Sequence, residues 1–155
     1  MAGGGHVVTK AELDMADYMR QACEAYVLKT GQTLKTADSP YAPELPKAQL
    51  DDLLAKPSKF QQLSASVLMK LLYAARMAVP WLSVGIQRLA RQVHEWTAEC
   101  DRRLHRLYCY VHTPIDQVLT GTLSTADLPN VRIDLWADAD IAGDLFSTKS
   151  TSGRF

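Results

Sequence analysis

Residues 62–78, QLSASVLMKLLYAARMA, form an almost wholly apolar stretch whose only two charges are Lys70 and Arg76. Their length and composition predict a helix over 60–78. A helix that is apolar nearly all round is usually buried inside something larger than a single layer. This stretch therefore predicts a mainly helical protein in which other elements pack around a central helix.

Two further helices are predicted downstream, over 80–95 and 97–113, each with apolar residues at helical spacing. Pro80 suits the first position of a helix, where its missing N–H is not needed. Thr97 is the expected cap of the second helix. Because the connections are very short, the three helices of 60–113 should pack as an antiparallel group.

A fourth helix is predicted upstream, over 10–30. Thr9 and Glu12 have the spacing of a capping box at its start, and Gly31 can end it in a left-handed conformation. The buried stripe of this helix is expected to contain Met15, Met19, Ala22, Cys23 and Tyr26.

Residues 31–58 are predicted to be a linker, because four of the seven prolines fall there. This segment contains Asp51 and Asp52, a pair that polymerases place on a hairpin to bind two metal ions. A polymerase hairpin needs an apolar strand on both sides of the acids, whereas prolines flank this pair. The sequence around it favours a short solvated helical turn on the surface.

After residue 113 the hydrophobic period changes from helical to two. Alternation predicts strands over 118–123 and 131–136, and a third over 147–155. The fold class is therefore α+β and mainly α, with about four helices followed by two or three strands.

Charge is balanced overall but unevenly distributed. Residues 76–112 carry six basic and three acidic residues, whereas 113–155 carry three basic and six acidic residues. This uneven charge has two explanations of about equal weight: a polyanion-binding surface, or chance variation in local charge. Within the basic region, the arginines expected to lie outside the buried stripes are Arg88, Arg91, Arg102, Arg103 and Arg106. A solvated helix face is the alternative to nucleic-acid binding for these five arginines.

Cysteine usage and the N-terminus bear on the cellular compartment. Three cysteines without a CxxC pair argue against a disulfide framework or a zinc ribbon, and His105 with Cys109 makes only a weak metal pair. The first residues lack the basic and apolar regions of a secretory signal, and no apolar run is long enough for a transmembrane helix. The sequence thus predicts an intracellular protein that does not enter a membrane.

The end of the chain carries two ordered motifs, Asp-Ala-Asp-Ile-Ala-Gly-Asp at 138–144 and Lys-Ser-Thr-Ser-Gly at 149–153. They resemble the opening of the ribonuclease H domain in copia-type retrotransposon polyproteins. Residues 67–77, 85–91 and 100–113 are similar, in the same order, to the segments that connect polymerase and nuclease in that family. Residues 10–46 weakly resemble the end of its reverse transcriptase.

This resemblance implies three regions: the end of a reverse transcriptase with a proline-rich linker over 1–58, connection helices over 59–114, and the start of a ribonuclease H-like sheet over 115–155. Asp138 takes the place of the first catalytic and metal-binding aspartate. The parent family uses Mg²⁺ and acts on RNA–DNA hybrids, with two metal ions about 4 Å apart.

The partner acids of the ribonuclease cluster and the polymerase carboxylates are expected outside this chain. One carboxylate binds Mg²⁺ poorly, so we expect neither catalysis nor stable metal binding by the chain alone. The expected partners are nucleic acid in the parent polyprotein and a second copy of the chain, through apolar helix surface. The alternative function is a host-expressed helical protein-interaction module derived from the element.

Overall fold

The computed structural model describes residues 7–113, 118–132, 134, 137–140 and 151–154, the two short C-terminal segments by their backbone only. It divides into two compact units. The larger unit comprises residues 11–121, and the smaller one combines residues 1–10 with 122–155.

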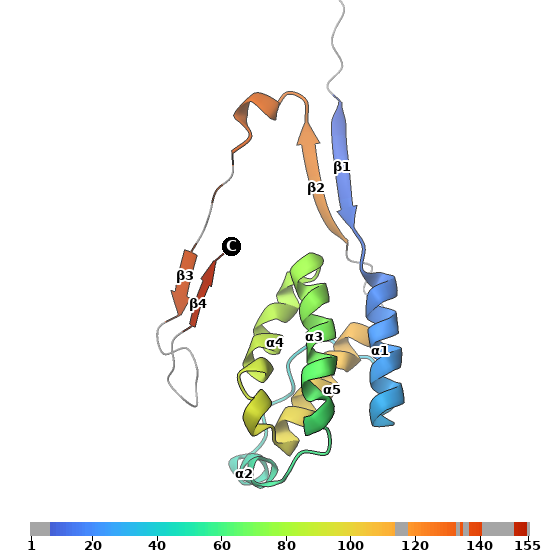
Figure 1. The fold of residues 1–155 in the computed structure, drawn as a ribbon, viewed down its shortest axis with the longest axis vertical. Coiled ribbons are helices and arrows are strands. Elements are labelled where there is room, and N and C mark those ends of the chain that lie inside the picture. The colour runs from blue at the N-terminus through green and yellow to red at the C-terminus, as the bar shows by residue number, and fades with distance from the viewer. Residues whose placement is uncertain (1–6, 114–117, 133, 135–136, 141–150, 155) are drawn as a thin grey trace, which may run out of the picture. The chain divides into compact units, whose positions relative to one another are not determined.

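The larger unit is built from helices, which Figure 1 labels along the chain. They are α1 (Ala16–Thr30), α2 (Lys47–Ala55), α3 (Gln61–Met77), α4 (Ser83–Ala90) and α5 (Ala98–His112). Successive helices alternate in direction, so that α4 runs antiparallel to α3 and α5 runs antiparallel to α4, as their short connections require. Helix α1 packs against α3 and α5. The α+β, mainly α prediction is confirmed.

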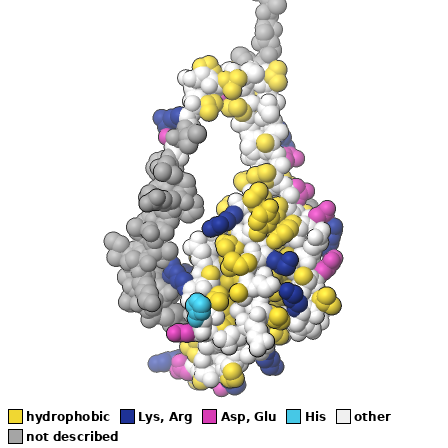
Figure 2. All heavy atoms as spheres, viewed as in Figure 1, with side chains coloured by type: hydrophobic (Ala, Val, Ile, Leu, Met, Phe, Trp, Pro, Cys, Tyr) yellow, Lys and Arg dark blue, Asp and Glu magenta, His cyan; other side chains and the backbone are white. Residues whose placement is uncertain are grey.

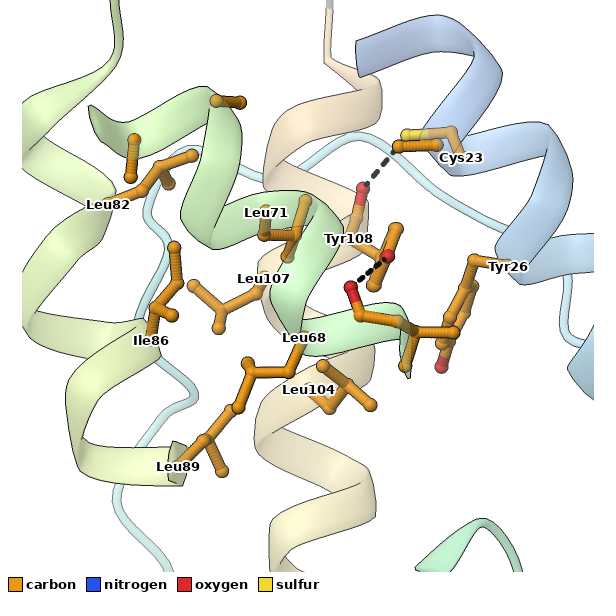
Figure 3. Packing of buried hydrophobic residues seen from close by; sticks show 14 of the residues in the cluster. Cys23, Tyr26, Leu68, Leu71, Leu82, Ile86, Leu89, Leu104, Leu107 and Tyr108 are labelled. Carbon is orange, nitrogen blue, oxygen red and sulfur yellow. Dashed lines mark hydrogen bonds between the residues drawn. The ribbon is translucent and has the colours of Figure 1, made fainter. Parts of the chain in front are cut away.

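The core lies where α1, α3, α4 and α5 meet. Fully buried leucines of α3 and α5 interdigitate with Ile86 and Leu89 of α4 (Figure 3). On the α1 side, Tyr26 stacks on Tyr108 with ring centroids 4.0 Å apart, and the Tyr108 hydroxyl donates a hydrogen bond to the Val67 carbonyl at 2.8 Å. Buried tyrosine hydroxyls need such partners. One core therefore joins α1 to the helices that follow the proline-rich segment.

The predicted start of the helix over 10–30 is wrong. Thr9 and Glu12 lie in a strand, β1 (Val8–Leu13), and α1 begins only at Ala16. Asp14 supplies the first-turn acceptor instead, because its carboxylate accepts a hydrogen bond from the Ala16 amide at 2.8 Å. The predicted end is confirmed, since Gly31 has the left-handed φ of 65°.

The helix predicted over 80–95 is shorter than expected. Residues 80–95 form a 3₁₀ turn at Pro80–Leu82, then α4, then a second 3₁₀ turn at Val93–Glu95. The backbone tightens after α4, where the Gln92 amide donates to the Leu89 carbonyl three residues back at 3.0 Å. Pro80 does occupy the first position, as predicted.

Two details at the helix packing differ from a simple reading of the pattern. Thr97 occupies the cap position of α5, but its hydroxyl donates to Cys100 Sγ at 3.5 Å and caps no backbone amide. Gly85 lies against Leu107, and a Cβ at this position would come within 3.1 Å of the leucine side chain. The missing side chain therefore lets α4 approach α5 closely.

The strands form two pairs and not one growing sheet. β1 pairs with β2 (Leu119–Ser124), and β3 (Ala137–Asp140) pairs antiparallel with β4 (Thr151–Arg154). The predicted strand over 131–136 is wrong at Val131, Arg132 and Asp134, which lie outside strands; the remainder of that prediction, and residues 141–150 of the closing motifs, fall outside the described residues. Of the described helices, none has both the length and the apolar character needed to cross a membrane.

Candidate nucleic-acid interface

The five predicted nucleic-acid-binding arginines fall into two groups in space. Arg88 lies on α4 and Arg91 immediately follows that helix, and both side chains are exposed. Arg102, Arg103 and Arg106 lie on α5 and are only half-exposed. The surroundings of the two groups differ, and this decides what each can bind.

Glu99 organises the arginines at the start of α5. Its side chain is only 2% exposed, and its carboxylate accepts hydrogen bonds from Arg102 Nε and Nη2 at 2.7 and 2.8 Å. Arg103 Nε donates to the same carboxylate at 2.8 Å. Burial raises the pKa of Glu99, but hydrogen bonds and charge from the two arginines outweigh this and hold it below its usual value. Glu99 is therefore a buried, ionised carboxylate that needs both arginines.

The other donors on this side of α5 hold the 37–43 segment, which precedes α2. Arg102 Nη1 donates to the Pro43 carbonyl at 3.0 Å, and Arg106 Nε donates to the Ser39 carbonyl at 2.8 Å. The Ala37 amide donates to Thr113 Oγ1 at 2.8 Å. Positions 102, 106 and 113 share one helix face. The proline-rich segment is thus fixed along α5, and the guanidinium groups satisfy its backbone carbonyls.

Asp101 anchors a second loop to the same helix. Its Oδ1 accepts hydrogen bonds from Trp96 Nε1 and from Ser58 Oγ, both at 2.7 Å, and its Oδ2 accepts one from the Lys59 amide at 2.8 Å. The loop between α2 and α3 is therefore attached to the first turn of α5. Glu99 and Asp101 thus give the first turn of α5 several of the side-chain contacts that hold the larger unit together.

The α3–α4 hairpin has a different character. Residues 61–94 contain four basic side chains, Lys70, Arg76, Arg88 and Arg91, and no aspartate or glutamate. Within the described part of the chain, Lys70, Arg76 and Arg88 make no ion pair, and Arg76 and Arg88 are exposed. Figure 2 shows Lys and Arg side chains among hydrophobic ones over α3. This hairpin therefore presents basic side chains and has no acidic side chains of its own.

An apolar stripe also runs along the outside of α3. Met69, Tyr73 and Met77 are 44%, 51% and 40% exposed, and their spacing of four residues places them on one face. Tyr18 of α1 lies beside the stripe, with its ring centroid 5.1 Å from that of Tyr73. The prediction of a helix buried nearly all round is therefore wrong for this face of α3.

The weak metal pair of the sequence is part of the core. The Tyr26 hydroxyl lies 3.2 Å from His105 Nδ1, and Cys109 Sγ lies 3.4 Å from His105 Nε2. Burial lowers the pKa of His105, whereas burial and the neighbouring Cys109 raise the pKa of Cys23 to about 12. Burial therefore favours the neutral forms of His105 and Cys23. No cluster of three or more metal-ligating side chains occurs among the described residues.

Asp138 lies in β3, in the smaller unit. Its backbone stands opposite Gly153 of β4, and Asp140 stands opposite Thr151. Residues 138–140 of the first closing motif and 151–153 of the second thus lie opposite each other in an antiparallel pair. The register places Asp138, the predicted catalytic aspartate, in a strand.

Sequence reasoning missed the acids that control the arginines of α5. Glu99 stands three and four residues before Arg102 and Arg103, the spacing at which opposite charges meet on a helix, so this signal was present. The contacts of Asp101 with Trp96 and the loop had no such signal, because the loop is about forty residues away along the chain.

Comparison of the whole chain with family models, with curated proteins and with solved structures finds no match.

Proposed function

We propose that this chain is the connection region of a copia-type retrotransposon polyprotein together with the start of its ribonuclease H, and that it acts by binding and not by catalysis. The residue motifs at 67–77, 85–91, 100–113 and 138–153 support the proposal. The parent enzyme would carry out RNA-templated DNA synthesis and cleavage of RNA–DNA hybrids. Three free, buried thiols suit an intracellular setting for such a protein.

The nucleic-acid contact proposed for the chain is the α3–α4 hairpin. One observation carries it: residues 61–94 have only basic charges, and Arg88 and Arg91 are exposed at the end of the hairpin. Phosphate contacts by such side chains give affinity that depends on salt and tolerates sequence variation. The arginines of α5 are assigned to Glu99 and to the 37–43 segment instead.

A titration with a short labelled RNA–DNA hybrid tests this assignment. At about 50 mM salt we expect binding by the full chain, and the double variant Arg88→Gln/Arg91→Gln should weaken it and reduce the salt slope by about 2. Arg20→Gln is the matched control, because Arg20 is exposed and forms an ion pair with Asp17 on α1. Binding that is absent at low salt, or equal in all three proteins, would refute the proposal.

For Asp138 we propose the position of the first ribonuclease H aspartate in the parent domain. When bound there, Mg²⁺ would activate water and stabilise the leaving oxygen. Because Mg²⁺ keeps its waters unless several hard oxygen ligands converge, Asp138 by itself gives no stable site. We therefore expect no hybrid cleavage by this chain. Mg²⁺-dependent cleavage that disappears with Asp138→Asn would overturn this view.

The second candidate function is a helical protein-interaction module. A specific observation favours it: the stripe of Met69, Tyr73 and Met77 exposes large apolar side chains on one face of α3. Aromatic residues, methionine and arginine are enriched at protein interfaces relative to the remaining surface. Loss of partner binding without loss of hybrid binding, after substitution in this stripe, distinguishes the second function from the first.

A further inference from the structure

We infer that the stripe on α3 is a docking surface for an acidic amphipathic helix of another protein. The inference rests on the second candidate function and is independent of nucleic-acid contact by Arg88 and Arg91. It commits to one class of partner, and the chemistry of the stripe and of its two borders identifies that class.

The shape of the stripe suits a helix. Met69, Tyr73 and Met77 cover eight residues of rise, about 12 Å, or a little more than two turns. One turn earlier the same face has the small exposed residues Ala65 and Ser66, over which another backbone can approach closely. Apolar rows at i, i+4 and i+8 are the ridges that pack against a second helix.

The apolar groups are of the kind that bind well. Methionine adapts to irregular partners, and tyrosine is among the commonest anchors of interfaces. The Tyr73 ring is already supported by Tyr18, with the two ring planes tilted by 56° and their centroids 5.1 Å apart. A side chain held in place before binding loses less entropy when a partner arrives.

The charges on the borders select the partner's sign. Arg76 and Lys70 lie on opposite sides of the stripe, and neither forms an ion pair within the described residues. Lys29 of α1 reaches the N-terminal end, where its Nζ donates to Ser66 Oγ at 3.2 Å. A partner helix with glutamates beside its apolar row would meet basic groups on both sides.

The same charges disfavour the two other occupants. A second copy that docks through the same stripe would place Lys70 and Arg76 against basic groups, which costs free energy at a contact. The phosphates of a nucleic acid would pair with the basic side chains on the borders, but they would make no favourable contact with the exposed Met69 and Met77. The acidic amphipathic helix uses both the apolar row and the charges.

The test uses the full chain and two synthetic helical peptides with an identical leucine row. One peptide carries glutamates beside the row, and in the other lysines replace them. We expect the acidic peptide to bind at least tenfold more tightly. Tyr73→Ala should weaken that binding about tenfold, because large losses concentrate at aromatic anchors. Leu28→Ala is the matched control, since Leu28 is exposed on α1 outside the stripe, and it should change nothing.

Three results would overturn the inference. The first is equal binding, or no binding, of the two peptides. The second is a dimer in light scattering that Met69→Glu converts to a monomer, which would assign the stripe to a second copy. The third is loss of RNA–DNA hybrid binding in Tyr73→Ala comparable to that in Arg88→Gln/Arg91→Gln, which would assign it to nucleic acid. Failure of hybrid binding alone would affect only the first candidate function.

Discussion

Helix α5 carries Arg102 and Arg106 on the side where Glu99 and the 37–43 segment lie, whereas α4 carries Arg88 on an open surface. The residue type is the same, but its surroundings differ between the two helices. On α5 the guanidinium groups neutralise a buried carboxylate and satisfy backbone carbonyls. On α4 the charge faces solvent in a hairpin without acids. The comparison shows that arginine position alone does not define a polyanion site; the acceptors within reach of each arginine decide.

The largest expected effect concerns the buried carboxylate. Glu99→Ala leaves Arg102 and Arg103 without their shared acceptor, and breaking a buried pair costs about 3–5 kcal/mol. Because both arginines keep some water contact, we expect about 3 kcal/mol loss in the free energy of unfolding. Asp52→Ala is the matched control, since its pair with Lys56 is more than half exposed and should contribute less than about 1 kcal/mol. Chemical denaturation measures both; equal effects would remove the distinction.

A pair of tryptophans extends the comparison to the ends of the two helices. Trp96 Nε1 donates to Asp101 of α5 at 2.7 Å, whereas Trp81 Nε1, at the start of the α4 region, is buried without an acceptor among the described residues. Trp96→Phe should lower the free energy of unfolding by about 1.5–3 kcal/mol, because it removes a hydrogen bond to a charged group.

Trp81→Phe should cost less, since it removes a donor that has no acceptor in the part of the chain that the structure describes. Each substitution also removes ring atoms from the packing, so the difference between the two variants is the relevant quantity. Thermal or chemical unfolding of both variants provides it. A Trp81→Phe loss as large as that of Trp96→Phe would contradict the assigned contacts.

Acid should weaken the core beside α5 through His105. Burial lowers the pKa of His105 in the folded state below its unfolded value of about 6.5. Above that pH the imidazole is neutral in both states and its contribution is fully present. As the pH falls below it, the unfolded state binds the proton first, so the free energy of unfolding decreases.

His105→Gln should flatten the dependence of unfolding free energy on pH between about 7.5 and 5.5. The matched control is His94→Gln, because His94 is an exposed histidine near the end of the α3–α4 hairpin. Denaturant titrations across this range measure the slope. A wild-type profile that is already flat would show that His105 does not titrate as its burial requires.

Local patterns predicted much of the helical unit. The apolar spacing of Ala22, Cys23 and Tyr26 placed them correctly in the core, and Gly31 ended α1 as its missing side chain allows. These features depend on neighbours within a few turns. The sequence did not predict which face of α3 is exposed, because the exposed face is as apolar in composition as the buried face and only packing distinguishes the two.

Long-range contacts account for the other errors. The capping-box spacing of Thr9 and Glu12 is a local helix signal, but the segment pairs as β1 with a strand more than a hundred residues later. The backbone acceptors of Arg102 and Arg106 lie in the 37–43 segment. Because every residue has a backbone carbonyl, the sequence does not indicate which carbonyls accept these hydrogen bonds. The pattern of charges therefore predicted that the arginines lie outside the buried stripes, but it did not predict the groups that they contact.

The central claim is that Arg88 and Arg91, and not the arginines of α5, contact nucleic acid. Its most direct test compares Arg88→Gln/Arg91→Gln with Arg102→Gln/Arg106→Gln in hybrid titrations at about 50 and 200 mM salt, alongside thermal unfolding of each protein. We predict that Arg88→Gln/Arg91→Gln loses affinity and salt dependence, while Arg102→Gln/Arg106→Gln melts at a lower temperature and keeps the wild-type salt slope. The reverse result, with affinity lost on α5 and stability lost on α4, would contradict the account.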